Sequence, residues 1–110
     1  MTPLPGRPVR GSATGRPIMA LLDLLGRRWA LRILWELRDG AKPTFRELQQ
    51  RCDGVSSSVL STRLRELGEA DLVDHTAGYA LTDQGRSLFE TLVRLDAWAA
   101  GWRPRDQSSS

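Results

Sequence analysis

The sequence predicts a mainly α-helical domain that carries one small β-hairpin. Through most of the chain, apolar residues recur at steps of three and four, which is the period of an amphipathic helix. The period changes at residues 72–76 and 79–82, two short β-prone runs separated by an Ala-Gly pair, where we expect a tight hairpin. A last amphipathic helix is predicted from Thr82 to about Trp102. The 110 residues fit one domain.

Two helices open the predicted domain. The first, residues 18–25, lies between a proline and a glycine, residue types that often mark where helices start and end. The second, residues 27–40, is apolar on most of its faces, which is typical of a central helix. We therefore expect Trp29 and Trp35 in the core. The alternative is that they line a pocket for a small-molecule effector.

Two further helices precede the hairpin, and each has a capping signal. Thr44 stands three residues before Glu47, which is the spacing of a capping box, so a third helix is expected at residues 45–52. A fourth is expected at residues 56–70, with Ser56 as its N-cap. Helix, turn, helix and then hairpin is the order of a winged helix-turn-helix domain, in which the hairpin is the wing; we expect the long last helix to serve dimerisation.

Composition divides the chain into three parts. Residues 1–16 are rich in Pro, Gly and Arg and are predicted to form a flexible basic tail. Residues 17–102 hold the predicted domain, and residues 103–110 are predicted to be a disordered end. No apolar run approaches the length of a membrane span, and the start has no apolar core of a secretory signal, so we expect a cytoplasmic protein without a membrane partner.

The residue inventory argues against an enzyme. One Cys and one His, Cys52 and His75, cannot supply a structural zinc site, and no phosphate-binding loop or nucleophile motif occurs. We predict no catalytic residues, metal or cofactor. The net charge is only +3, but fifteen of the sixteen basic residues are Arg, which suits phosphate. A GC-rich genome would also favour Arg over Lys.

The fourth helix has the pattern of a DNA-reading helix. Leu60, Leu64 and Leu67 define its buried side at 3.6 residues per turn, which places a small polar face with one long Arg opposite them. Small hydroxyl side chains permit close approach to a major groove, and Arg65 could reach guanine or phosphate. Arg63 lies nearer the buried stripe, where it would touch phosphate or pair with an acid. The alternative is that this face is merely solvated. The candidate DNA-binding residues are Thr44, Arg46, Ser56, Ser57, Ser58, Ser61, Thr62, Arg63, Arg65, His75 and Thr76.

Residues 17 to about 100 resemble the HxlR-type winged helix regulators. The matching stretches are LLDLLGRRWALRILWELRDG, FRELQQRCDGVSSSVLSTRLRELGEADLV and YALTDQGRSL; the second is the most specific, because it fixes turn, fourth helix and wing entry together. The resemblance implies a DNA-binding dimer, a recognition helix at residues 56–67 and dimerisation through the first and last helices. Many members carry Cys-Pro before the first helix. Here Arg16-Pro17 stands there, so thiol sensing at that position is not available, and the wing is shorter than is typical.

The last helix has an apolar stripe that suits a partner helix. Its apolar side chains recur at three- and four-residue steps, and a domain this small has few surfaces to cover so long a helix. The alternative is that the stripe packs only on its own core. The expected homodimer interface comprises Ile18, Leu22, Leu88, Leu92, Leu95, Trp98 and Trp102.

Two further residues have alternative interpretations. We expect Cys52 to be a small buried hydrophobic residue, although a redox role for it is the alternative. We expect His75 to be an exposed wing residue, and the alternatives are a phosphate contact or a pH switch.

The function that these observations favour is sequence-specific regulation of transcription by a homodimer on double-stranded DNA with an inverted-repeat operator. A winged-helix module for protein–protein contact without DNA binding is the alternative from another class. Regulators of the MarR or PadR kind are the near alternatives, because they share the winged-helix architecture. An effector of unknown chemistry is left open.

Overall fold

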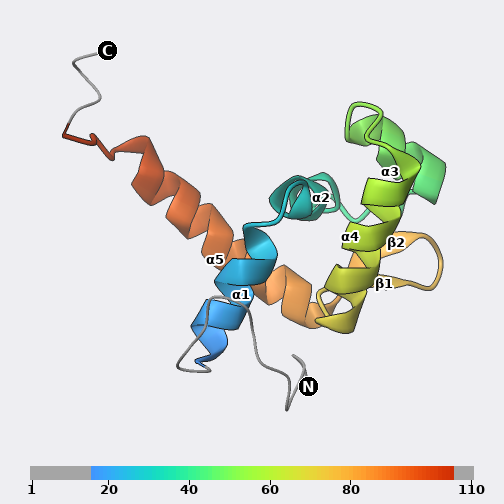
Figure 1. Cartoon of the computed structure of the whole chain (residues 1–110), viewed down its shortest axis with the longest axis horizontal. Coiled ribbons are helices and arrows are strands. Elements are labelled where there is room, and N and C mark those ends of the chain that lie inside the picture. The colour runs from blue at the N-terminus through green and yellow to red at the C-terminus, as the bar shows by residue number, and fades with distance from the viewer. Residues whose placement is uncertain (1–15, 106–110) are drawn as a thin grey trace.

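The structure is a computed structural model, and it describes residues 16–105. Five helices and one hairpin follow each other in the predicted order (Figure 1). The elements are α1 (Pro17–Leu25), α2 (Ala30–Glu36), α3 (Phe45–Arg51), α4 (Ser57–Glu69), β1 (Val73–His75), β2 (Tyr79–Leu81) and α5 (Asp83–Ala100). The predicted fold class, mainly helical with a small hairpin and a long last helix, is confirmed. The predicted tail at residues 1–15 and the end at 106–110 lie outside the described residues.

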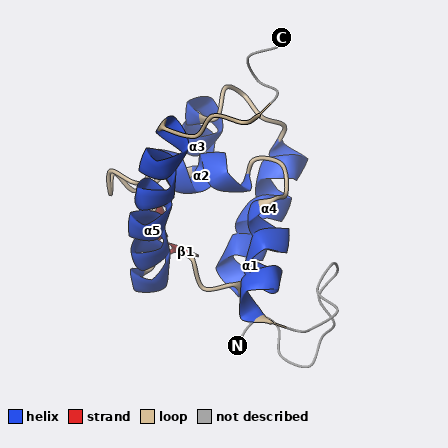
Figure 2. Ribbon diagram, turned by 90° about the vertical axis from the view of Figure 1, so that its left-hand side faces the viewer, coloured by secondary structure: helices blue, strands red, loops and turns tan. Residues whose placement is uncertain are grey.

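The elements separate into two ends of the molecule. In Figure 1, α3, α4 and the hairpin gather at one end, while the C-terminal half of α5 extends away at the other. Figure 2 shows α1 and α5 on opposite sides of the molecule with a gap between their ribbons. The first end therefore holds the helix-turn-helix and the wing, while α1 and the far half of α5 lie outside it, on opposite sides of the molecule.

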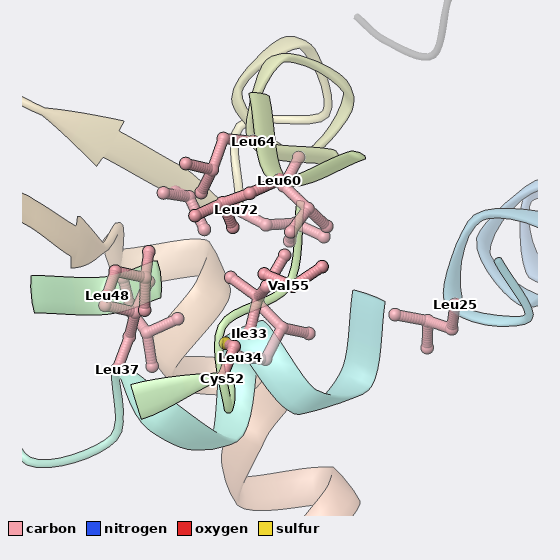
Figure 3. Packing of buried hydrophobic residues seen from close by; sticks show 13 residues of the cluster. Leu25, Ile33, Leu34, Leu37, Leu48, Cys52, Val55, Leu60, Leu64 and Leu72 are labelled. Atoms are coloured by element: carbon pink, nitrogen blue, oxygen red, sulfur yellow. The ribbon is translucent and has the colours of Figure 1, made fainter. Parts of the chain in front are cut away.

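A single apolar core joins α2, α3, α4 and the hairpin. Ile33 and Leu34 of α2 lie among residues from α3 and α4, including Leu48, Cys52 and Leu60 (Figure 3). The side chains named here are at most 1% exposed, so each contributes close to its full burial free energy, about 1.5–3 kcal/mol for a large aliphatic side chain. Leu25 of α1 lies at the margin of this cluster (Figure 3). The core is thus built mainly at the helix-turn-helix end.

The hairpin pairs β1 with β2 in antiparallel register, with His75 opposite Tyr79. The Tyr79 N–H donates to the Pro43 carbonyl at 2.9 Å, which ties the segment before α3 to the open edge of β2. Gly78 has φ +101°, and a Cβ there would overlap the Lys42 carbonyl, so this turn requires glycine. The wing is therefore anchored on the helix-turn-helix rather than projecting freely.

The predicted helix starts are confirmed for α3, α4 and α5. Thr44 accepts from the Glu47 N–H at 3.1 Å, and the Glu47 carboxylate accepts from the Thr44 N–H at 2.9 Å, which completes the capping box. Ser56 caps α4 through the Val59 N–H, and Thr82 caps α5 through the Gly85 N–H. These starts were predictable because the capping partners lie within three residues of each other.

Two expectations about the second helix are wrong. The helix begins at Ala30 rather than at residue 27, because Trp29 adopts a left-handed conformation with φ +77° after a turn. It also ends at Glu36, and residues 37–39 form a turn. Trp35 is not in the core but 47% exposed. Its ring packs on Phe89 of α5, with 5.8 Å between the ring centroids, and the Arg38 guanidinium lies 4.0 Å from the Trp35 ring centroid. Trp29 is half-buried and packs against the core, so the core position expected for it is confirmed in part.

Candidate nucleic-acid interface

The polar face of α4 is open on the side opposite its buried leucines. Leu60 and Leu67 are fully buried, whereas Ser57, Ser58 and Ser61 are exposed and Thr62 is half-buried. One edge of a thirteen-residue helix therefore carries only small hydroxyl side chains over its first two turns. Such an edge permits close approach of a groove, and hydroxyls can either donate to or accept from base edges.

The turn before α4 fixes the direction in which this helix begins. Asp53 and Gly54 both adopt left-handed conformations, which reverse the chain between α3 and α4. Gln49 of α3 donates from Nε2 to the Val55 carbonyl at 2.8 Å and to the Ser57 hydroxyl at 3.2 Å. Gln49 could not be predicted from the sequence, since a bond across eight residues leaves no local pattern.

Two arginines extend from this end of the molecule into solvent. Arg65 is 62% exposed and meets Glu69 at 3.9 Å, an exposed contact of little energetic weight that leaves the guanidinium available. Arg46 on α3 is exposed, and it makes no ion pair or side-chain hydrogen bond with another residue in the described part of the chain. Both are therefore placed as phosphate or base contacts would need to be. Thr44, next to Arg46, is exposed but already engaged as a cap.

Arg63 is turned inward and has its partners within the molecule. Its Nε donates to the Arg28 carbonyl at 2.7 Å, and its Nη1 meets the Glu66 carboxylate at 2.9 Å. The side chain is only 19% exposed. Of the two roles expected for Arg63, the pairing with an acid is the one that the structure contains.

The wing presents a stacked pair of rings rather than a flexible tip. The His75 and Tyr79 rings stack with their centroids 3.9 Å apart and their planes nearly parallel, and Tyr79 also meets Phe45 of α3 edge-on at 6.5 Å. His75 is exposed, as expected, and Thr76 follows it in the exposed loop. Stacking on Tyr79 holds the imidazole in one orientation.

The residues expected at a dimer interface fall into two groups. Leu88 and Leu92 are half-buried and pack against their own core. Apolar side chains farther along α5 and on α1 are exposed by 47–64%: Ile18, Leu22, Leu95, Trp98 and Trp102. Trp98, near the end of α5, and Trp102, just after it, stack at 6.1 Å between ring centroids, so two exposed aromatic rings lie together there.

Cys52 is fully buried beside Leu48, as expected for a small hydrophobic residue. Burial raises the pKa of its thiol, and the nearby Arg32 only partly opposes this effect. The thiolate that would react with an oxidant is thus disfavoured. Within residues 16–105 no group of three His, Cys, Asp or Glu side chains could hold a metal ion.

A shallow cleft of about 380 Å³ lies at the root of the wing, between the hairpin and the start of α5. Lys42, Asp74 and Arg86 are among the residues that line it. Neither Trp29 nor Trp35 borders this cleft, so the effector pocket considered for these tryptophans has no counterpart there. None of the described helices is both long and apolar enough to span a membrane.

This fold, with an open polar face on α4 and a hairpin beside it, defines a winged helix-turn-helix protein. The profile of the HxlR-like helix-turn-helix family matches residues 24–107 of the chain. The chain therefore belongs to the HxlR family, whose members are transcriptional regulators and not enzymes. Family membership also decides against the MarR and PadR alternatives.

Relatives and solved structures agree with this assignment. YvaP, an HTH-type transcriptional regulator of Bacillus subtilis (strain 168), is 33% identical over 89 residues, which cover 74% of this chain and 82% of YvaP. An HTH-type transcriptional regulator of Mycobacterium tuberculosis (strain ATCC 25618 / H37Rv) is 35% identical over 101 residues, and the match covers 84% of this chain but only 63% of that longer relative.

Among solved structures, the quinone-bound form of YodB from B. subtilis has a TM-score of 0.71 and 31% identity, covering 77% of this chain and 97% of that one. A possible HxlR family transcriptional factor from Thermoplasma volcanium GSS1 has a TM-score of 0.67 and 29% identity, covering 77% and 83% of the two chains.

Proposed function

We propose that the chain is a homodimeric, sequence-specific transcriptional regulator that reads an inverted-repeat operator with α4. The observation that carries this proposal is the exposed face of α4, where Ser57, Ser58 and Ser61 lie open while the opposite side of the helix is buried. The proposal assigns both DNA reading and dimerisation to residues 17–102. Acting on chromosomal DNA, such a regulator would work in the cytoplasm.

The roles of the reading face follow from chemistry and exposure. Arg65 is its long donor and would grip a guanine edge or a phosphate, while Ser58 and Thr62 would tune the preference at neighbouring bases. The α4 N-terminus adds free backbone N–H groups that favour phosphate. Arg46 and the wing residues His75 and Thr76 would contribute backbone contacts, which give affinity without sequence preference.

The dimer part of the proposal rests on apolar surface that the single chain leaves open. Leu95 and Trp98 on α5, Trp102 just after α5 and Leu22 on α1 are each more than half exposed. Clustered exposed side chains of this size mark interaction surfaces, and Trp98 and Trp102 stack on each other. A two-fold axis through α1 and α5 would cover them with the same residues of a second copy.

An effector is also part of the proposal, with its chemistry left open. YodB has been solved in a quinone-bound form, and quinones react with exposed thiols. The only Cys of this chain is Cys52, which is buried, so we expect any effector of this protein to bind without attack by a thiol.

Selection of bound sites from random duplex DNA tests the proposed function. We expect enrichment of one half-site in two inverted copies, with centres about 34–36 Å or about 10–10.5 base pairs apart. Binding should weaken steeply with salt, because phosphate contacts release counterions. If no sequence is enriched and binding to random duplex is undetectable even at low salt, the chain is a protein-interaction module instead.

A further inference from the structure

The connection between α1 and α2 is joined to α4 by a compact set of charged contacts, here called the Glu66 junction. It comprises Asp23 of α1, Arg27 and the Arg28 carbonyl of the connection, and Arg63 and Glu66 of α4. The residues of the connection and those of α4 are more than 30 positions apart in the sequence, and none of them is one of the exposed hydroxyl residues of α4. The junction therefore links the α1 end of the molecule to the reading helix.

Glu66 is the centre of the junction, because each of its carboxylate oxygens meets a different arginine. Oε2 lies 2.9 Å from Arg27 Nη1, and Oε1 lies 2.9 Å from Arg63 Nη1. Arg27 also meets Asp23 at 3.0 Å, and Arg63 donates to the Arg28 carbonyl at 2.7 Å. Four short contacts thus run without interruption from α1 to α4.

The junction is sheltered enough to hold its geometry. The side chains of Glu66 and Arg63 are 18% and 19% exposed, and those of Asp23 and Arg27 are 24% and 34% exposed. Two acids balance two bases, so the group carries no net charge. Charge-assisted hydrogen bonds in such a partly desolvated network are stronger than isolated surface ion pairs.

The position of Glu66 on α4 allows the junction to influence how the reading face of this helix is oriented toward DNA. Glu66 follows Thr62 by four residues, so the two side chains lie on the same edge of the helix, one turn apart. Contacts at Glu66 therefore fix the rotation of the reading face about the α4 axis. At the other end of the network, α1 carries Leu22, which belongs to the proposed dimer surface.

We propose that Glu66 is a positioning residue that fixes the angle of α4 relative to α1 and so sets the half-site spacing that the dimer accepts. This inference rests on the proposed function. In a two-fold dimer formed by α1 and α5, the distance and angle between the two α4 helices depend on how each α4 is attached to these helices. One base pair added between half-sites displaces and rotates one half-site relative to the other, since B-DNA turns once in about 10–10.5 base pairs. A rigid link between α1 and α4, added to the packing of the α4 leucines in the core, allows the dimer to reject such a change.

The test compares operators of different spacing. The selected inverted repeat is prepared as found, with one base pair removed, and with one or two inserted between half-sites. Wild type should lose about tenfold or more in affinity for each wrong spacing, because one helix then misses its groove. E66Q should retain dimers and bind all four operators within about threefold of each other, since the half-site contacts remain while the angle is free.

Two further variants separate positioning from a general structural role. R27Q cuts the link to α1 but leaves the contact between Arg63 and Glu66, so it remains testable even if E66Q folds poorly. It should relax spacing as E66Q does, and the double variant should be no more relaxed than either single variant. E69Q, which removes a carboxylate from the same helix outside the junction, should keep the wild-type ratio between spacings.

The outcomes distinguish this inference from the proposed function. If wild type discriminates between spacings and both E66Q and R27Q discriminate equally well, the positioning role of Glu66 is wrong while the regulator proposal stands. If wild type selects an inverted repeat but binds every spacing alike, the positioning inference is wrong while the regulator proposal stands; if it selects no inverted repeat, both are wrong. Relaxed spacing in E66Q and R27Q with wild-type spacing in E69Q supports the inference.

Discussion

The two ends of this molecule distribute their apolar residues in opposite ways. At the end that carries α3, α4 and the hairpin, Leu48 and Leu60 are fully buried and the surface is polar. At the end that carries the far half of α5, Leu95 and Trp98 are 58% and 64% exposed. We call the first end finished, because its apolar core is complete within one chain. We call the second end unfinished, because its apolar side chains stay exposed in the single chain; in the proposed dimer a second copy would cover them.

This difference implies that the same kind of substitution should have different consequences at the two ends. Removing a leucine from the finished end should weaken folding, because it leaves a cavity among packed neighbours. Removing one from the unfinished end should weaken assembly, since its neighbours in the single chain are few.

The largest effect should come from charges placed at the unfinished end. L95E combined with W98E should give monomers at micromolar concentration, because two buried charges at an interface cannot be desolvated without partners. Sedimentation velocity measures the change, with circular dichroism to show that the monomer is folded. The matched control is L31E, at a leucine of similar exposure outside the proposed interface, which should remain dimeric. A wild-type chain that sediments as a monomer at high concentration contradicts the proposed assembly.

At the finished end, L60A should lower the free energy of unfolding by about 2–5 kcal/mol, because Leu60 is fully buried in the core cluster. L31A makes the same chemical change at an exposed position and should cost about 0.5 kcal/mol or less. Urea unfolding at one fixed protein concentration measures both, because dimer stability depends on concentration. Equal losses for the two variants would mean that Leu60 is not part of a packed core.

A smaller effect is expected at the start of α3. T44A removes both the side-chain cap and its part in the capping box, and it should cost about 0.5–2 kcal/mol of stability. Thr44→Ser keeps the hydroxyl and should restore most of this loss. Urea unfolding again provides the measurement, and a serine variant as unstable as T44A would show that the cap is not the cause.

The smallest effect is expected at Cys52. Because burial raises the pKa of this thiol, its thiolate is scarce at neutral pH, and iodoacetamide should label it only after unfolding. C52S should leave the response of DNA binding to mild oxidants unchanged. Mass spectrometry of native and urea-unfolded protein measures the labelling. If oxidant releases wild type from DNA but not C52S, Cys52 is a sensor after all.

Local features of the sequence were sufficient to predict much of the helix-turn-helix end. The capping box at Thr44, the cap at Ser56 and the leucine stripe of α4 involve residues within one or two turns of each other, so their outcome depends little on the rest of the fold. The exposed serines of α4 follow from the same stripe. The roles of these residues toward DNA remain predictions.

Features that depend on tertiary contacts could not be predicted in this way. The turn at Trp29 interrupts a stretch with an apparently continuous helical pattern, and the apolar Trp35 lies on the surface beside Phe89, a residue 54 positions later. The last helix has one uniform apolar stripe in sequence, yet its first half packs on its own core and its second half does not. Gln49 and Glu66 carry no distinctive local pattern either.

The central claim is that α4 is the reading helix of this regulator. Its most direct test is the affinity of a variant altered at Ser58, Thr62 and Arg65 together, each to alanine, for the selected operator and for random DNA. We expect the variant to remain a dimer and lose most of its preference for the operator, with Arg65 alone contributing about 1–3 kcal/mol if it grips a guanine. Unchanged affinity for both DNAs would contradict the account and remove α4 as the reader.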